Sequence, residues 1–177
     1  PMMLLAGPLG GKMRLFLIPS LLAIGCGPSP STISGSVAGI PFETVGTAMW
    51  GGRYLVLVDQ EMDCIDMAWV HRNYSEGVDL GTTDFVALQF TFGRGQEVTE
   101  SPLPYSVQGV AEVSARLIDY TDGIFDAGDE YRGLDGLLFV ETIKQKDWAG
   151  GTFDIEFSDG DTLVGEFSAD WCVNLPD

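Results

Sequence analysis

The residues best suited to chemistry form an acidic segment between Asp119 and Asp135, in which carboxylates are interspersed with glycines. Hard cations such as Ca²⁺ bind several oxygen ligands on a turning backbone, and aspartate-rich loops with glycines provide them. The spacing differs from an EF-hand, because the third and fifth positions counted from Asp119 are Thr121 and Gly123. The segment is interpreted either as a calcium site or as a solvated acidic hairpin loop; the candidate ligands are Asp119, Asp122, Asp126, Asp129 and Glu130.

Other catalytic arrangements find little support. His71 is the only histidine, which excludes a zinc site with two or three histidine ligands. A Ser/His/Asp triad would have to use His71, and the sequence lacks the Gly-x-Ser-x-Gly elbow that presents a nucleophilic serine. A pair of Asp or Glu residues remains available for glycoside hydrolysis, but the sequence singles out no such pair.

Aromatic residues offer a second kind of site. They form either a surface for a ligand or carbohydrate, or part of the core and the sheet packing, since aromatic side chains dominate burial in small β domains. The residues concerned are Trp50, Trp69, Trp148, Trp171, Tyr54, Tyr74, Tyr105 and Tyr131.

Near the N-terminus, the basic residues Lys12 and Arg14 precede an apolar run, 15–24, and then Gly25 and Cys26. This order resembles a bacterial lipoprotein signal, whose lipobox Leu-(Ala/Ser)-(Gly/Ala)-Cys corresponds here to Ala-Ile-Gly-Cys. The resemblance implies a signal peptide over 13–25 and a lipid, such as palmitate, on Cys26. The alternative, a membrane-spanning or core helix, is disfavoured because Pro19 interrupts a run far shorter than the ~20 residues of a span. Residues 1–12 are expected to be translated upstream sequence or a fragment artefact.

The segment after Cys26 is rich in proline and serine, so residues 26–33 are predicted to form a flexible tether before a β-rich domain over 34–177. With Cys26 assigned to the lipid, Cys64 and Cys172 remain in a compartment that permits disulfides. We expect them to pair; two separate buried thiols are the alternative.

The mature chain has seven basic and 26 acidic residues, a net charge of −19. Binding to nucleic acids requires lysines and arginines that neutralise phosphates, so a nucleic-acid partner is excluded. Membrane contact is therefore expected through the lipid anchor, and any ligand or protein partner is unknown.

Short segments rich in β-branched and aromatic residues alternate with Gly, Asp, Asn and Pro clusters, which predicts an all-β fold. We expect a single antiparallel β-sandwich or barrel-like domain of about 8–10 short strands, and the sequence shows no periodic helix pattern longer than a turn or two. The secondary structure of residues 64–70 stays open, because a short helix, an irregular turn and a strand all fit this segment. The expected strands are 33–42, 47–50, 53–58, 84–92, 105–110, 112–119, 137–144, 151–158 and 162–169.

Two glycine-containing motifs resemble those of a group of uncharacterised bacterial lipoproteins. The first is Ser-Gly-Ser-Val-Ala-Gly-Ile-Pro-Phe, 34–42, and the second runs from Gly150 through Asp-Gly and Gly-Glu-Phe-Ser-Ala to Cys172. The resemblance implies an anchored β-rich domain with a tying disulfide and no particular activity.

We therefore expect a lipid-anchored protein of the cell envelope, in the outer membrane because Gly27 follows the lipidated cysteine, with a non-catalytic binding or structural role and no cofactor. One alternative is a calcium-dependent adhesion or carbohydrate-binding module, since 122–130 is similar to the calcium-associated loops of bacterial surface adhesin repeats. The other is an envelope hydrolase that uses an Asp/Glu pair.

Overall fold

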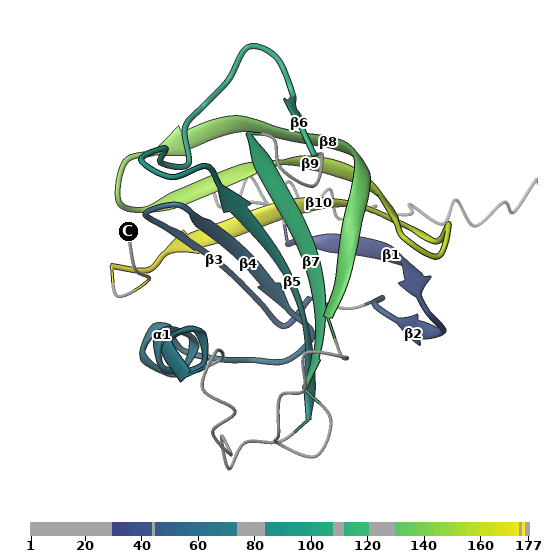
Figure 1. Ribbon diagram of the computed structural model, residues 1–177. Coiled ribbons are helices and arrows are strands. Elements are labelled where there is room, and N and C mark those ends of the chain that lie inside the picture. Colours follow the sequence, from purple (N-terminus) through teal and green to yellow (C-terminus); the bar gives the residue numbers. More distant parts are fainter. Residues whose placement is uncertain are drawn as a thin grey trace, which may run out of the picture.

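The computed structural model describes residues 30–43, 45–73, 84–107, 112–120, 130–173 and 175. Within them the chain forms ten strands and one helix (Figure 1): β1 Thr32–Val37, β2 Ile40–Pro41, β3 Thr47–Gly51, β4 Tyr54–Val58, α1 Cys64–Asn73, β5 Phe85–Phe92, β6 Tyr105–Ser106, β7 Val113–Tyr120, β8 Glu130–Lys144, β9 Trp148–Phe157 and β10 Thr162–Trp171. This confirms the predicted all-β class.

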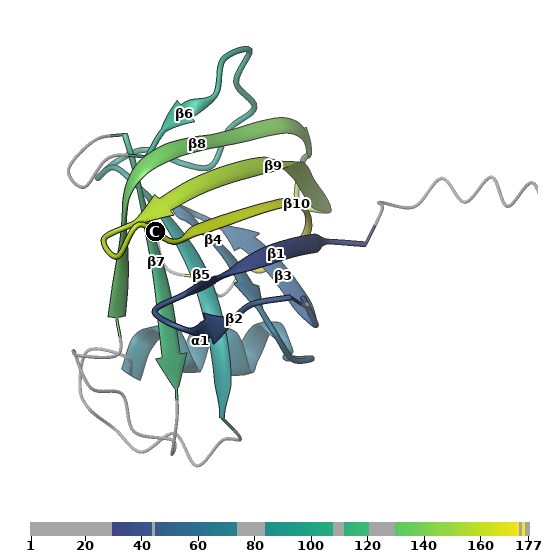
Figure 2. The same cartoon turned by 90° about the vertical axis from the view of Figure 1, so that its right-hand side faces the viewer.

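Seven strands close into a barrel in the order β3, β4, β5, β7, β8, β9 and β10, with β10 returning to β3. Neighbours are antiparallel except at the closure, where β10 runs parallel to β3 and pairs Asp170 with Met49 and Trp171 with Trp50. The strands β1 and β6 add to β10 and β8, and β2 adds to β1. Figure 2 shows β8, β9, β10 and β1 side by side in this order, crossing the direction of β5 and β7. Closure pairs strand edges that an open sheet would expose.

The barrel interior is filled by side chains from alternate positions of each strand, as the period of two requires. On β5, for example, Leu88, Phe90 and Phe92 point inward and are almost completely buried. Phe90 packs against Phe153 of β9, with ring centroids 5.5 Å apart. The predicted alternation of β5 is therefore confirmed, and the interior is a packed core.

A second apolar cluster lies on the outer face of β3, β4, β5 and β7. Val56 and Val58 of β4 belong to it, while Leu55 and Leu57 face the barrel interior, so both faces of this strand are buried as its sequence predicted. Met67 of α1 covers the cluster from outside the ring of strands (Figure 1). The helix thus stabilises the sheet by burying an apolar surface that would otherwise face water.

The segment 64–70, whose type the sequence left open, lies in a helix: α1 has ten residues and is longer than the short helix considered there. The local cause is a cap: the Oδ1 atom of Asp63 accepts hydrogen bonds from the backbone N–H groups of Ile65 and Asp66, each at 2.8 Å. Such an N-cap satisfies amides that have no partner within the helix. The apolar residues of α1 follow no clear helical period, so periodicity alone did not reveal it.

Several boundaries differ from prediction. β1 begins at Thr32, two residues before the expected domain start, because Ile33 is already buried in the core. β8 begins at Glu130 and bends at irregularities between Gly133 and Asp135 and between Val140 and Thr142. β9 begins at Trp148, three residues before the expected strand start at Gly151. The hairpins after Gly51 and at 158–161 lie where the turn signals placed them.

Candidate functional site

The parallel pairing of β10 with β3 brings two tryptophans together at one end of the barrel. Trp50 and Trp171 are register partners, and their ring centroids lie 4.5 Å apart at an interplanar angle of 68°. The backbone N–H of Cys172 donates to the carbonyl of Trp50 at 2.8 Å, which continues the pairing by one residue. Trp50 is buried and Trp171 is half-buried, so the second ring keeps an accessible part.

The connection from β5 to β6 crosses the same end of the barrel. The N–H of Val98 donates to the carbonyl of Gly52 at 3.0 Å, and the N–H of Ser101 donates to that of Val140 at 3.2 Å. These bonds attach the connection to both sides of the barrel end. The side chain of Val98 is buried there, close to the two tryptophans.

Together these segments form a pocket of about 450 Å³, here called the tryptophan pocket. Its apolar wall consists of Trp50, Trp171, Val98 and Ile143. Its polar groups come from the connection after β5 and from the β8–β9 hairpin, namely Glu97, Thr99, Glu100, Gln145 and Lys146. A mainly apolar cavity with a few polar groups at the mouth of a barrel is typical of a small-molecule site.

Trp50 contributes a polar group that the described residues do not satisfy. Its Nε1–H is buried and has no hydrogen-bond acceptor among them. A buried donor without an acceptor costs about 1–3 kcal/mol. This nitrogen has almost no accessible surface, so it lies within the packed core and not on the open wall of the pocket.

One carboxylate at the rim is fixed in place. Glu100 accepts a short hydrogen bond through Oε1 from the backbone N–H of Ile143, which joins the connection to β8. Nearby, the hydroxyl group of Tyr105 lies 2.8 Å from Thr99 Oγ1 and 2.9 Å from the Thr99 carbonyl oxygen, to which it can donate. The rim is thus preorganised by bonds between segments that are distant along the chain.

A second groove, of about 670 Å³, lies outside the barrel across β1, β10, β9 and β8. Leu137, Phe139 and Val164 line it, and both Leu137 and Val164 are exposed. Asp154 and Glu166 border this apolar surface. Five polar residues line this groove, as many as line the tryptophan pocket, and nothing in its geometry specifies an occupant.

A third groove, of about 620 Å³, lies beside β3 and the start of α1 and contains Glu61, Asp63, Asp66 and Asp170. Asp63 already serves as the helix cap. In the described parts of the chain, no three His, Cys, Asp or Glu side chains form a group that could hold a metal ion. The acidity of this groove therefore defines no metal centre.

The predicted calcium ligands are only partly described. Asp119 lies in β7, and Glu130 opens β8 with only its backbone described. Asp122, Asp126 and Asp129 lie outside the described residues. The calcium site therefore stays a prediction.

Asp119 does have an acidic neighbour, Asp59, which follows β4. Asp59 accepts a hydrogen bond at 3.0 Å from the N–H of Val86, the register partner of Asp119. Burial raises the pKa of the Asp59 carboxyl, and the charge of Asp119 adds to this rise, whereas the Val86 hydrogen bond opposes it. A hydrolase that uses an acid pair holds both carboxylates in the substrate cleft. Neither, however, lines any of the grooves described above.

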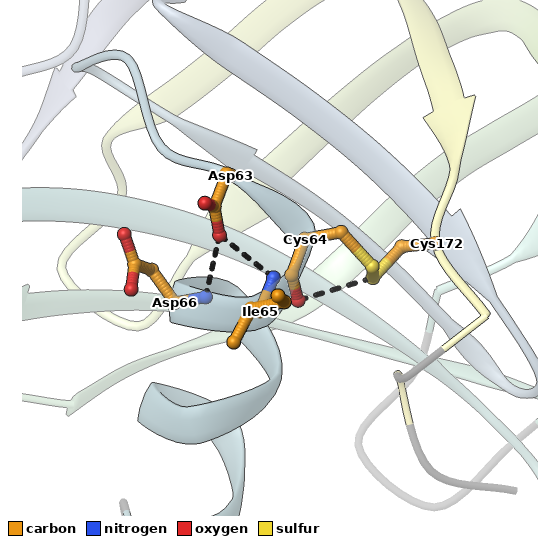
Figure 3. The surroundings of a disulfide bond; sticks show 5 residues. All are labelled: Asp63, Cys64, Ile65, Asp66 and Cys172. Carbon is orange, nitrogen blue, oxygen red and sulfur yellow. Dashed lines mark hydrogen bonds between the residues drawn. A yellow bond between two sulfur atoms is a disulfide. The ribbon is translucent and has the colours of Figure 1, made fainter.

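The predicted disulfide is present. Cys64 at the start of α1 is bonded to Cys172 after β10, with Cα atoms 5.4 Å apart and 108 positions of sequence separation. Figure 3 shows the bond beside the Asp63 cap of the helix. Cys172 Sγ also lies 3.4 Å from the Cys64 carbonyl oxygen, a contact only, since a disulfide sulfur carries no hydrogen. The bond ties the helix that covers the outer cluster to the strand that closes the barrel.

The other candidates are dispersed or undescribed. Trp148 lies on β9 outside the tryptophan pocket, and Tyr54 lies under the guanidinium of Arg53, 5.7 Å from the ring centroid. Cys26 and Tyr74 lie outside the described residues, as do the side chains of Trp69 and His71. Tyr131 packs against the barrel core. Of the predicted aromatic residues, the structure thus joins Trp50 and Trp171 at one pocket.

Sequence reasoning missed the polar rim of this pocket. Glu97 and Glu100 belong to a connection without periodicity, and Gln145 and Lys146 belong to a hairpin turn. The turn signal around Lys146 located the hairpin but could not show which barrel end it faces. A parallel pairing between β3 and β10 has no local signal in the sequence, because it depends on the whole topology.

α1, the helix of the described part of the chain, is not long and apolar enough to cross a membrane. Comparisons with protein-family models, curated proteins and solved structures find no match to this chain.

Proposed function

We propose that this chain is an exported, lipid-anchored protein of the bacterial outer membrane that binds a small ligand in the tryptophan pocket and does not act as a catalyst. The observation on which the proposal rests is that pocket, in which the accessible part of Trp171 lies among polar groups from two connections. Its apolar walls and few polar groups suit binding.

The Cys64–Cys172 bond supports an exported location. Disulfides persist in oxidising compartments such as the bacterial envelope and are rare in the cytosol. Cys172 is almost completely buried, so the bond is part of the packed structure. The lipoprotein-like signal before Cys26 supports the same location.

The short distance along the chain from Cys26 to the barrel supports anchoring close to the membrane. β1 begins at Thr32, six residues after Cys26, and a chain of this length spans at most about 20 Å. Ser31 is held to β10, because the N–H of Ser168 donates to its Oγ atom at 2.8 Å. A lipidated Cys26 would therefore keep the barrel at the membrane surface.

Anchoring is tested by expressing the wild type and Cys26→Ser in a bacterium that processes lipoproteins. We expect palmitate labelling and membrane association for the wild type, and loss of both in the variant. A Cys64→Ser/Cys172→Ser variant is the matched control, because it also loses cysteines but should keep the label. Labelling that persists after Cys26→Ser would contradict the lipid assignment.

Binding is tested with the Cys26→Ser protein and a library of sugars, sugar acids, amino acids, amines and fatty acids in a thermal-shift screen. We expect at least one class to raise the melting temperature of this protein, with loss of the shift in Trp171→Ala. Mass spectrometry of the bound compound after prolonged incubation should find it unchanged. No shift by any class would refute the binding role, and conversion to a product would support the hydrolase alternative.

A further inference from the structure

We propose that the outer groove across β1, β10, β9 and β8 is the surface with which the barrel lies against the phospholipid bilayer that holds Cys26. We call this surface the anchor face; its apolar members are Leu137, Phe139 and Val164, and its acidic members are Asp154 and Glu166. The inference rests on the proposed function, because it assumes the lipid on Cys26. It adds the orientation of the barrel on the membrane and the kind of headgroup that the barrel contacts.

The chain enters the barrel at the edge of this face. Ser31 is fixed to β10, because its Oγ atom donates to the carbonyl of Ser168 at 3.2 Å and accepts from the N–H of Ser168 at 2.8 Å. Thr32 and Ser34, which follow on β1, already line the groove. Cys26 lies five residues before Ser31, so at most about 18 Å separate a lipidated Cys26 from this fixed point. The place of the groove along the chain, and not its shape, therefore identifies the bilayer as its partner.

Exposed apolar side chains follow the anchor face across the strands, which lie side by side in Figure 2. The register places Leu137 of β8 and Val164 of β10 in one row, with Asp154 of β9 between them. These two aliphatic side chains are 51% and 45% exposed. Phe139 and Pro104 extend the apolar lining. Exposed apolar surface of this kind marks a contact with a partner or a membrane, and apolar side chains at the headgroup boundary add to a lipid anchor.

The charges of the anchor face select the kind of lipid. Asp154 and Glu166 line the groove, and none of its described lining residues is a lysine or an arginine. Anionic headgroups attract basic segments and repel carboxylates. Phosphatidylethanolamine, in contrast, is zwitterionic and carries an ammonium group that can donate to these carboxylates. The face therefore suits zwitterionic phospholipid and not phosphatidylglycerol.

The other groove at the entry of the chain suits a bilayer less well. Ser31 also lines the groove beside β3, but four carboxylates belong to that wall, namely Glu61, Asp63, Asp66 and Asp170. Pressing this wall against a bilayer would remove water from twice as many charges as the groove of the anchor face contains.

Trp148 continues the anchor face toward the β8–β9 hairpin. It lines a cavity of about 260 Å³ that shares Thr152 and Glu166 with the groove and contains one more carboxylate, Glu141. Trp148 is half-buried, so part of its indole is accessible. Tryptophan is enriched where apolar surface meets lipid headgroups. The ring thus lies where the border of a membrane contact is expected.

The test labels single positions of the lipidated protein with an environment-sensitive fluorophore. An added cysteine is the only free thiol, because Cys26 carries the lipid and Cys64 is bonded to Cys172. Val164→Cys places the label on the anchor face. Ser114→Cys is the matched control, because it lies on the outer side of β7, three strands from β10 around the ring.

Both labelled proteins are reconstituted into vesicles of phosphatidylethanolamine and phosphatidylcholine whose acyl chains carry bromine. We expect the brominated lipid to quench most of the fluorescence at position 164 and to leave that at position 114 unchanged. Vesicles rich in phosphatidylglycerol should quench position 164 less. Leu137→Cys, in the same row of the face, is the second probe if Val164→Cys lowers the melting temperature.

The outcomes separate this inference from the proposed anchoring. If the protein incorporates palmitate and floats with the vesicles, but both positions are quenched alike or neither is, the anchor face is overturned and the lipid anchor stands. If position 164 is shielded from aqueous iodide without quenching by brominated lipid, the groove is covered by the protein's own acyl chain or by a second copy, and the bilayer contact is refuted. If palmitate labelling and flotation are both absent, the anchor and the inference fail together.

Discussion

The Cys64–Cys172 disulfide should contribute several kcal/mol to the stability of the barrel. The bond closes a loop with a sequence separation of 108, which contains β5 to β10 and most of α1. In the chain-entropy model, a loop of about 100 residues stabilises the folded state by about 4.7 kcal/mol, because the cross-link restricts the unfolded chain. Total stabilities of single domains are about 5–15 kcal/mol, so this is a large share.

The structure also indicates that the barrel should remain folded without the bond. The segment of Cys172 is still held by the hydrogen bond from its N–H to the Trp50 carbonyl, and Met67 still packs in the outer cluster. Loss of the bond should therefore lower the free energy of unfolding without changing the native circular dichroism. The variant to compare is Cys64→Ala/Cys172→Ala in a Cys26→Ser background, which excludes competing thiol reactions.

Equilibrium unfolding in urea, followed by circular dichroism, measures the difference. We expect the free energy of unfolding to fall by about 3–5 kcal/mol relative to the oxidised Cys26→Ser protein. Mass spectrometry of the non-reduced protein should find a peptide that joins Cys64 to Cys172. A decrease below ~1 kcal/mol with the bond verified would refute the loop-entropy reasoning, and free thiols at both positions would refute the bond itself.

Three further predictions concern single residues. Burial raises the pKa of Asp59 in the folded state, so protonation of this carboxyl favours folding. The stabilisation by the protonated carboxyl is complete below pH 3.8, the ordinary pKa, and is lost as the pH rises through the native pKa. Asp59→Asn should therefore raise the melting temperature at pH 7, with the gain vanishing near pH 3.8; an equal gain at both pH values would contradict this. Hydrogen bonds from the N–H groups of Asp161 and Ala38 lower the pKa of Asp159, so the ionised carboxylate stabilises the folded state. This stabilisation is present above pH 3.8 and is lost as the pH falls through the lower native pKa. Asp159→Asn should lower the melting temperature at pH 7 and have no effect once the wild-type carboxyl is protonated, which a pH series of thermal melts checks. Gly151→Ala should lower the free energy of unfolding by at least ~2 kcal/mol in urea titrations, because its Cβ would collide with the Phe139 carbonyl oxygen across the β8–β9 pair. An unchanged urea midpoint would contradict this, since it would mean that β8 and β9 move apart at that point without loss of stability.

Much of the sheet was predictable from local patterns. The alternation in 84–92 identified both the inward and outward faces of β5, and the Gly51-Gly52 signal located the β3–β4 hairpin. These patterns succeed because a strand with buried side chains must keep a period of two. The pairing of Cys64 with Cys172 was also predictable, because only two cysteines remained after Cys26 was assigned.

The helix and the pocket were less accessible to sequence reasoning. Asp63 provides a capping signal for α1, but the residues after it lack an amphipathic period. Among the α1 side chains that the structure describes, Met67 and Ala68 are buried. The tryptophan pocket depends on the register between Trp50 and Trp171, which are separated by most of the domain. Such long-range pairing follows from closure of the barrel, not from the residues near either tryptophan.

The final strand determines when this barrel can form. β3 finds one of its two neighbours, β4, immediately after it in the chain, but its other neighbour is β10. During synthesis from the N-terminus, the leading strands can form hairpins while the ring stays incomplete until Trp171 has emerged. Non-local contacts of this kind make folding slow. The chain order thus leaves the ring open until β10 is available to pair with β3.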